Sequence, residues 1–291
     1  MDLERAGDRE PAAPPEPTPV LVDAPWLAAH RRDVVVLHVD EDASAYHQAH
    51  LPGARAVSTY DDLHEPVRRG PASRQHLEQV LSRLGVHADD HLVLYSADSP
   101  SHAAYAFWLL RRHGHQRLSL LDGGLRAWRD VGGPVEDHPV VAVTGGYRSR
   151  GGDDSIVVGR DELLARYVGA PGPALLLDCR TPAEHAGHVG HPLDVAAERH
   201  RVPGHIPGSR NLPSHLVLDG HRFAGREHLQ RLFAEHGLRP DSDVVVYCRV
   251  ADRSSVLWFA LAELVGHPRV RHYVGGWAEY GSLVDVPVEL D

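Results

Sequence analysis

The sequence predicts an α/β protein built from two tandem copies of one unit, each a mostly parallel sheet flanked by helices on both faces. Three observations predict this class. The chain has 291 residues, enough for two domains. It repeats itself at an offset of 152 residues. Short apolar runs alternate with helical patterns, which is typical of buried parallel strands and the helices that cover them.

The internal repeat is visible in three kinds of segment. The stretch GVHADDHLVLYS from Gly85 matches GLRPDSDVVVYC from Gly237. A Gly-Gly pair begins at Gly123 and again at Gly275, and a His-x-Pro-Gly turn begins at His50 and again at His205. So many matches at nearly one offset indicate a duplicated unit of about 120–140 residues. We therefore expect a flexible tail at 1–17, a first domain at 18–135, a linker at 136–154 and a second domain at 155–291.

The second unit shows its elements in order. Continuous apolar runs predict buried strands at 175–177, 244–247 and 270–274. Helical patterns, several of them ending at glycine, predict helices at 160–167, 226–236 and 254–265. The glycine-rich stretch 132–154 predicts the connection between the units.

Composition excludes several classes of protein. Forty acidic residues against 30 basic ones give a formal charge of −10, which disfavours a nucleic-acid binder. The chain has no lysine, which excludes a Schiff-base enzyme and a P-loop NTPase. No apolar stretch is long enough to cross a membrane. The N-terminal stretch lacks the pattern of a secretory signal, so we expect a cytoplasmic protein.

One loop carries the clearest chemical signal. An apolar strand ends at Tyr247, Cys248 follows, and a helix begins near Ser254. Arg249 and Arg253 lie in the loop between them. A helix N-terminus and two guanidinium groups favour a thiolate, so we expect Cys248 to be ionised and reactive. The alternative is an inert buried cysteine.

The number of residues between the cysteine and the second arginine distinguishes between two kinds of cysteine enzyme. Cysteine phosphatases place five residues between their cysteine and arginine, whereas only four separate Cys248 from Arg253. A shorter ring of backbone amides suits a smaller anionic centre, such as a single outer sulfur atom. The sequence therefore predicts a persulfide on Cys248.

The duplicated unit resembles the rhodanese domain, and the chain resembles a tandem-domain sulfurtransferase. The motifs that carry the resemblance are DCRTPAE at 178–184, HIPGSRN at 205–211, the loop 248–254 and VGGWAEYG at 274–281. The family implies a double displacement, in which Cys248 takes sulfur from a donor and passes it to a thiophilic acceptor. Ser96 stands at the matching position of the first unit, so we expect that unit to lack this chemistry.

Several residues are expected to support the loop and bind the donor. Asp178 and Arg180 end a neighbouring strand, so Arg180 either faces the substrate or forms a structural pair with Asp178. Asp252 is expected to hold the shape of the loop. Arg249 and Arg253 are the candidates to bind an anionic donor.

Thiosulfate, a dianion, fits two loop arginines as the donor. Mercaptopyruvate-type members resemble Cys-Gly-Ser/Thr-Gly-Val-Thr at the loop and carry arginine where this chain has Glu184, which disfavours that donor. Many members also have glycine at the position of Ala251, so the loop backbone is expected to differ slightly. The partners expected are a small anionic sulfur donor and a thiophilic acceptor, cyanide or a thiol, with a protein thiol as a further option. The alternatives are 3-mercaptopyruvate as donor, a persulfide carrier or redox module serving a protein partner, and a non-catalytic scaffold.

A second cysteine and a group of histidines could also carry chemistry. Cys179 is expected to be a core residue, with an internal disulfide to Cys248 as the alternative. Histidines recur near the second unit's first strand, at His185, His188, His191, His200 and His205. Glycine and proline interrupt this stretch, which indicates a loop, so we expect no metal site and no cofactor.

Overall fold

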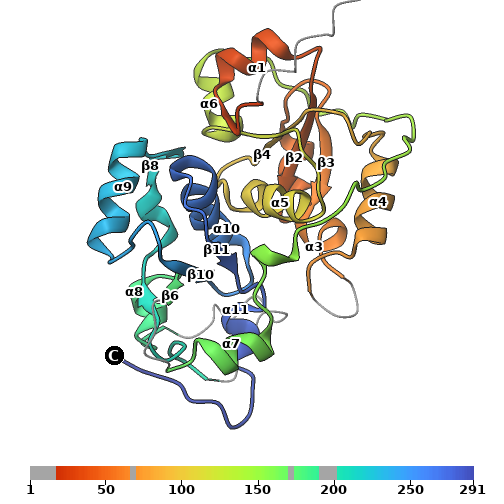
Figure 1. The fold of residues 1–291 in the computed structure, drawn as a ribbon. Helices are drawn as coiled ribbons and strands as arrows, with labels where there is room; N and C mark the ends of the chain where they lie inside the picture. Colours follow the sequence, from red (N-terminus) through yellow and green to blue (C-terminus); the bar gives the residue numbers. More distant parts are fainter. Residues whose placement is uncertain (1–17, 66–69, 170–173, 190–201) are drawn as a thin grey trace, which may run out of the picture.

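The chain folds into two α/β domains, each built on its own parallel sheet (Figure 1). The structure is a computed structural model and describes residues 18–65, 70–169, 174–189 and 202–291. The predicted fold class is confirmed. The expected tail at 1–17 lies outside the described residues.

The first domain contains a five-stranded parallel sheet in the order β1-β5-β4-β2-β3. Its strands are β1 (Leu21–Val22), β2 (Val35–Asp40), β3 (Arg55–Ser58), β4 (Leu92–Tyr95) and β5 (Leu118–Leu121). Its helices are α1 (Ala24–His30), α2 (Ser44–Gln48), α3 (Thr59–Asp62), α4 (Arg74–Arg83), α5 (Ser101–Arg112) and α6 (Gly124–Asp130).

The second domain repeats this order in a four-stranded parallel sheet, β11-β10-β6-β7. Its strands are β6 (Ala174–Asp178), β7 (Arg210–Asn211), β10 (Asp243–Tyr247) and β11 (Val270–His272), and a small hairpin joins β8 (Leu218–Asp219) to β9 (Arg222–Phe223). Its helices are α7 (Arg160–Arg166), α8 (Pro182–His185), α9 (Arg226–Glu235), α10 (Asp252–Phe259) and α11 (Gly276–Tyr280), with short 3-10 turns η1 (Asp154–Ile156) and η3 (Ser214–Val217).

The predicted strands and helices of the second domain differ from the observed ones mainly at their ends. The helix expected at 254–265 begins two residues earlier, at Asp252, and continues after Phe259 as a π-helix, η4 (Ala260–Val265). It stops at Gly266, which has a left-handed φ of 78°. The strand expected at 270–274 ends at His272, where the chain turns towards α11.

Each sheet buries both faces, but the two faces pack differently. In the first domain α1, α2 and α6 cover an outer face with its own small core. In the second domain α7 and α11 do the same. The inner faces, covered by α4, α5, α9 and α10, belong to one continuous core that includes residues of both domains.

Equivalent helices of the two repeats meet at the domain interface. Helices α5 and α10 pack against each other between the sheets (Figure 1). The ring of Phe107 lies edge-on to Phe259, with centroids 4.9 Å apart. Arg111 pairs with Glu263 at 3.2 Å, and Asp122 accepts a hydrogen bond from the backbone N–H of Phe223 at 2.9 Å. The two domains therefore share a core, and these contacts fix their relative orientation.

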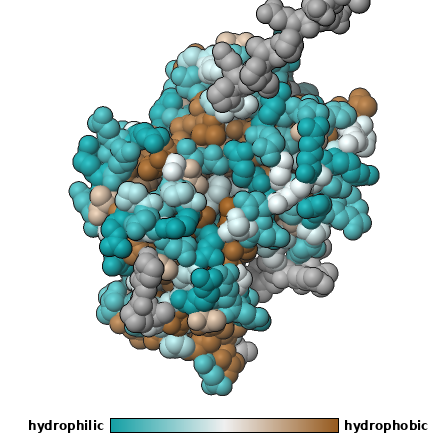
Figure 2. All heavy atoms as spheres, viewed as in Figure 1, coloured by the Kyte–Doolittle hydropathy of each residue, from teal (hydrophilic) through white to brown (hydrophobic). Residues whose placement is uncertain are grey.

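The outer surface is mostly hydrophilic on the face that Figure 2 shows, with apolar atoms in scattered areas. This agrees with the chain's excess of acidic residues. In the described parts of the chain, no helix combines the length and the apolar composition required to span a membrane.

Removing the Phe259 ring should destabilise the whole chain, because this buried ring packs against both Phe107 and Phe223. We expect Phe259→Ala to lower the free energy of unfolding, measured by urea denaturation, by about 3–5 kcal/mol. Val284→Ala, at a side chain that is 75% exposed, should change it by less than about 0.5 kcal/mol. Equal effects of the two substitutions would contradict a core shared between the domains.

Candidate active site

The loop after β10 is held by the first turn of α11. Cys248 follows Tyr247 at the carboxyl end of β10, and its carbonyl accepts the N–H of Trp277 at 2.8 Å. Gly276 has a φ of +55°, and a Cβ there would lie 2.4 Å from the carbonyl oxygen of Arg249. The second glycine of the repeated Gly-Gly pair is therefore required by this close approach of two backbones.

Ala251 gives the loop its turn into α10. It adopts a φ of 87°, in the left-handed region that glycine prefers. Its carbonyl accepts a hydrogen bond from the hydroxyl of Ser255 at 2.9 Å and lies 3.1 Å from Oγ of Ser254. An alanine in this conformation costs roughly 1–2 kcal/mol. The loop thus keeps a glycine-type backbone despite carrying alanine.

The thiol of Cys248 is fully buried between two polar side chains. It donates to Oδ1 of Asp252 at 3.4 Å, and the Ser254 hydroxyl donates to its sulfur at 3.3 Å. Burial, followed by the negative charge of Asp252, raises the pKa of Cys248. Arg253 and Ser254 lower it, but they do not reverse the shift. This direction of the pKa shift runs against the expected resting thiolate, because desolvation and a nearby carboxylate outweigh the guanidinium charge.

His272 supports the serine that contacts the sulfur. Its Nε2 lies 2.6 Å from Oγ of Ser254. Burial lowers the pKa of His272 to about 3, so the ring is neutral at neutral pH. Among the described residues its Nδ1 has no hydrogen-bond partner, which favours a proton on Nε2. Nε2–H then donates to Ser254, and the Ser254 hydroxyl remains able to donate to Cys248.

Arg253 is bound by Glu184 on its far side. The guanidinium donates to both carboxylate oxygens of Glu184, at 2.8 and 3.0 Å. Glu184 also accepts the N–H and hydroxyl of Thr181 as part of the capping box of α8. Burial raises the pKa of Glu184, but hydrogen bonds from Arg253 and Thr181 lower it to about 2 overall. The ion pair fixes Arg253 beside the loop with a quarter of its side chain exposed.

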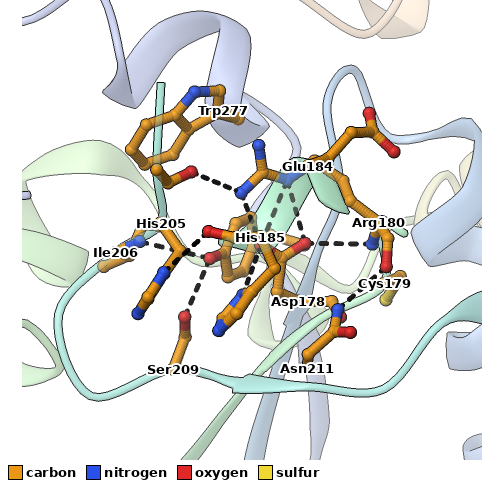
Figure 3. Close-up of polar contacts among 12 residues, drawn as sticks. Asp178, Cys179, Arg180, Glu184, His185, His205, Ile206, Ser209, Asn211 and Trp277 are labelled. Carbon is orange, nitrogen blue, oxygen red and sulfur yellow. Dashed lines mark hydrogen bonds and ion pairs between the residues drawn. The ribbon is translucent and has the colours of Figure 1, made fainter. Parts of the chain in front are cut away.

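Arg180 lies in the core rather than at a cleft (Figure 3). It donates to both oxygens of Asp178, at 2.6–3.1 Å, and to the carbonyl of Gly204 at 2.8 Å. Its guanidinium also lies 4.8 Å from the centre of the Trp277 ring. This placement agrees with a structural Asp–Arg pair and opposes the expected contact between Arg180 and substrate. Asp178 acts on the site by anchoring Arg180 under α11.

Cys179 and Cys248 each follow the last residue of one of two paired strands, β6 and β10. The register ends with the pair Tyr247 and Asp178, and the N–H of Cys179 donates to the Tyr247 carbonyl at 2.8 Å. Both are free thiols in the shared core. Burial raises the pKa of Cys179 well above its usual value. It is the core residue that the sequence predicts, and the disulfide with Cys248 stays a hypothesis.

A cavity of about 620 Å³ lies between the domains beside the loop. Val250 of the loop forms part of its wall. The first domain contributes an aromatic wall, in which His64 stacks on Tyr105. The second domain contributes charged and polar groups that include Arg160, Tyr273 and Glu279. The two domains thus form a cleft at the loop that neither could form alone.

Sequence reasoning found the loop and its charged residues but missed three contacts. The sequence predicts a helix start at Ser254 and shows Glu184 as a departure from the mercaptopyruvate-type pattern, and it predicts no role for His272. The position of Ser254 six residues after Cys248 was a usable signal. His272 belongs to another strand, and no local signal connects it to the loop.

Known proteins resemble this chain over most of its length. The family described as Rhodanese-like domain matches residues 23–130 and 160–283. A "Putative thiosulfate sulfurtransferase" of Mycobacterium tuberculosis is 39% identical over 274 residues, which cover 93% of this chain and 98% of that one. The "Sulfur carrier protein TtuD" of Thermus thermophilus is 37% identical over 273 residues, 92% of this chain and 96% of that one. The crystal structure of the 3-mercaptopyruvate sulfotransferase SseA of Escherichia coli matches with a TM-score of 0.77 and 25% identity, over 89% of this chain and 99% of that one.

Neutralising Asp252 should lower the pKa of the Cys248 thiol, because the carboxylate charge raises it. We expect Asp252→Asn, in a Cys179→Ser background, to move the pH titration of thiolate absorbance to lower pH. The signal is taken as the difference from the corresponding protein with Cys248→Ser, which removes the tyrosine contribution. Asp241→Asn, at an exposed carboxylate before the amino end of β10, should leave the titration unchanged. A shift of the Asp252→Asn titration to higher pH would refute the assigned contact.

Proposed function

Because this chain belongs to the rhodanese family of sulfurtransferases, we propose that it moves a sulfane sulfur from thiosulfate to a thiophilic acceptor through a persulfide on Cys248. The observation that carries this proposal is the place of the Cys248 sulfur. It lies at the carboxyl end of β10, in a loop that lines the cleft between the domains. Ligands of parallel α/β sheets bind at this end of the strands.

In the first half-reaction, Cys248 attacks the outer sulfur of thiosulfate. The new bond joins its Sγ to that sulfur, and the bond between the two sulfur atoms of thiosulfate breaks. Sulfite leaves with the bonding electron pair. Asp252, which already accepts the S–H hydrogen bond, is the group placed to take the thiol proton. Activation during the reaction, rather than a resting thiolate, fits the raised pKa of Cys248.

In the second half-reaction, the acceptor attacks the outer sulfur of the persulfide. A bond from acceptor to sulfur forms, and the bond between the two sulfur atoms on Cys248 breaks. The Cys248 sulfur leaves as a thiolate, which the Ser254 hydroxyl is placed to stabilise at 3.3 Å. Cyanide becomes thiocyanate in this step, and a thiol becomes a persulfide.

Thiosulfate is the proposed donor because the loop that follows the cysteine carries two positive charges. Arg249 and Arg253 lie one and five residues after Cys248. The Glu184 pair holds Arg253 in place, and both arginines are candidates to meet the sulfonate. The relatives named for thiosulfate support this donor. The E. coli structure makes 3-mercaptopyruvate the second candidate, and the T. thermophilus sulfur carrier makes a protein thiol the second candidate acceptor.

The first domain is proposed to form part of the wall of the cleft and not to carry the transferred sulfur. Ser96 stands at the cysteine position, where its hydroxyl donates to the Val39 carbonyl at 2.7 Å and accepts the N–H of Ala103 at 3.0 Å. These hydrogen bonds hold the loop after β4, which corresponds to the loop after β10 but has a serine hydroxyl in place of the cysteine sulfur. The aromatic wall of the cleft, Tyr60, His64 and Tyr105, comes from this domain.

Replacing the proposed nucleophile should abolish turnover. We expect Cys248→Ser to reduce thiocyanate formation from thiosulfate and cyanide by at least about a thousandfold. Cys179→Ser removes the neighbouring thiol and serves as the matched control, with activity retained. Full activity of the Cys248→Ser protein would end the proposal.

Removing the Arg249 charge should weaken donor binding. A hydrogen bond to a charged group contributes about 1.5–3 kcal/mol, so we expect Arg249→Ala to raise the KM for thiosulfate about tenfold or more. Arg239→Ala, before the opposite end of β10, should leave the KM unchanged. An effect of Arg249→Ala confined to the acceptor kinetics would contradict the assignment. Rates with 3-mercaptopyruvate, measured in parallel, decide between the two donors.

A further inference from the structure

A buried histidine lies two hydrogen bonds away from the Cys248 sulfur. His272 ends β11, and its Nε2 lies 2.6 Å from Oγ of Ser254, which in turn lies 3.3 Å from Sγ of Cys248. We propose that His272 is a positioning residue for sulfur transfer, which donates to Ser254 and thereby directs the Ser254 proton towards the Cys248 sulfur. This inference rests on the proposed function, because it assigns His272 a role in the step that releases the Cys248 thiolate.

The backbone of His272 is held on both sides. Within the sheet, His272 is in register with Val246, two residues before Cys248. On its other side, its carbonyl accepts the N–H of Val158 at 3.0 Å. Residues in register on parallel strands point to the same face, and the Val246 and Cys248 side chains both belong to the core shared by the domains. The strand therefore places the His272 ring beneath the loop that begins at Cys248.

The first domain holds the His272 ring through Trp108 of α5. The two rings lie edge to face, with centroids 4.9 Å apart and planes 78° apart. Both side chains are fully buried. In a close-packed core, a ring enclosed in this way cannot turn without displacing its neighbours. The domain that lacks the reactive cysteine thus helps to keep Nε2 of His272 at the Ser254 hydroxyl.

The position of the single ring proton of His272 decides the direction of the hydrogen bond. Burial lowers the pKa of His272 to about 3, so the ring is neutral at neutral pH. Among the residues that the structure describes, Nδ1 has no partner, and a proton there would be a buried donor without an acceptor. The proton is therefore assigned to Nε2, which donates to Oγ of Ser254. The Ser254 hydroxyl must then donate to another atom.

Two acceptors compete for the Ser254 proton. Sγ of Cys248 lies 3.3 Å away, and the carbonyl oxygen of Ala251 lies 3.1 Å away. The carbonyl does not change during the reaction, whereas the sulfur becomes negative when its bond to the outer sulfur breaks. A hydrogen bond to an ionised acceptor is about twice as strong as a neutral one, and donation from His272 polarises the hydroxyl further. The contribution of His272 is therefore greatest when Cys248 is a thiolate.

The first domain shows that the fold does not require this histidine. The offset of 152 residues places Leu120 of β5 at the position of His272, and His102 at the position of Ser254. Leu120 is buried, and Nδ1 of His102 lies 3.0 Å from Oγ1 of Thr59. The domain without the reactive cysteine therefore has neither the histidine nor the serine. Because burying an imidazole costs free energy that burying leucine does not, His272 is better explained by the reaction than by packing.

The test compares His272→Leu, which copies the first domain, with His272→Gln, which keeps an N–H donor at the end of the side chain. Both are made in the full chain with Cys179→Ser, so that Cys248 is the single cysteine, and its pKa is measured from the pH dependence of alkylation by iodoacetamide. We expect His272→Leu to raise the pKa of Cys248 by about 0.5–1 pH unit. It should slow discharge of the persulfide by cyanide about three- to tenfold and leave the KM for thiosulfate unchanged. His272→Gln should keep the parent pKa and rate.

A Ser254→Ala background separates action through Ser254 from a general change of packing. There we expect His272→Leu to leave the pKa of Cys248 unchanged, because the contact is already broken. The control His91→Leu removes a buried histidine that lies 2.7 Å from Ser119 in the first domain, and it should change neither the pKa nor the discharge rate. An unchanged pKa in His272→Leu, an equal rise in His272→Gln, or the same rise in the Ser254→Ala background would overturn the proposal. Alkylation needs no sulfur transfer, so failure of the proposed function would leave this readout intact.

Discussion

The packing of the 248–254 loop around a buried sulfur is the constraint on which the other features of the second domain depend. Gly276 lets α11 approach the loop backbone, and Ala251 accepts a left-handed conformation so that α10 can begin at once. The helix that follows carries Phe259 into the interface with the first domain. The backbone conformation of the loop therefore sets the direction of α10, and the direction of α10 sets the contact between the two domains.

Burial has the largest effect on the pKa of Cys248. Desolvation raises the pKa of the Cys248 thiol more than the nearby guanidinium lowers it, and Asp252 lies within hydrogen-bond distance of the sulfur. Asp252 opposes ionisation through its charge, yet it is also the acceptor to which the proton can move. The Glu184–Arg253 pair is held on the other side of the loop by the cap of α8. In the proposed mechanism, Asp252 accepts the thiol proton and the arginines of the loop bind the anionic donor.

Sequence reasoning predicted the features that are encoded locally or by repetition. The internal repeat gave two domains with the same strand order, and the strand–cysteine–helix pattern gave the loop. Features that depend on contacts between distant segments were missed or misjudged. The burial of Arg180 depends on Gly204 and Trp277, and the neutral ring of His272 depends on its place beneath the loop. The glycines and proline between His185 and His205 predict a loop, whereas the fold brings the two rings together, with Nδ1 of His185 at Asp178 and Nδ1 of His205 at the carbonyl of His185.

The claim that the transferred sulfur is carried by Cys248 is tested most directly by mass spectrometry of the protein after incubation with thiosulfate and removal of the excess. We expect the peptide containing Cys248 to gain the mass of one sulfur atom and to lose it again on addition of cyanide, while the peptide containing Cys179 is unchanged. A Cys248 peptide that gains no sulfur, or a gain found on Cys179 instead, would contradict it.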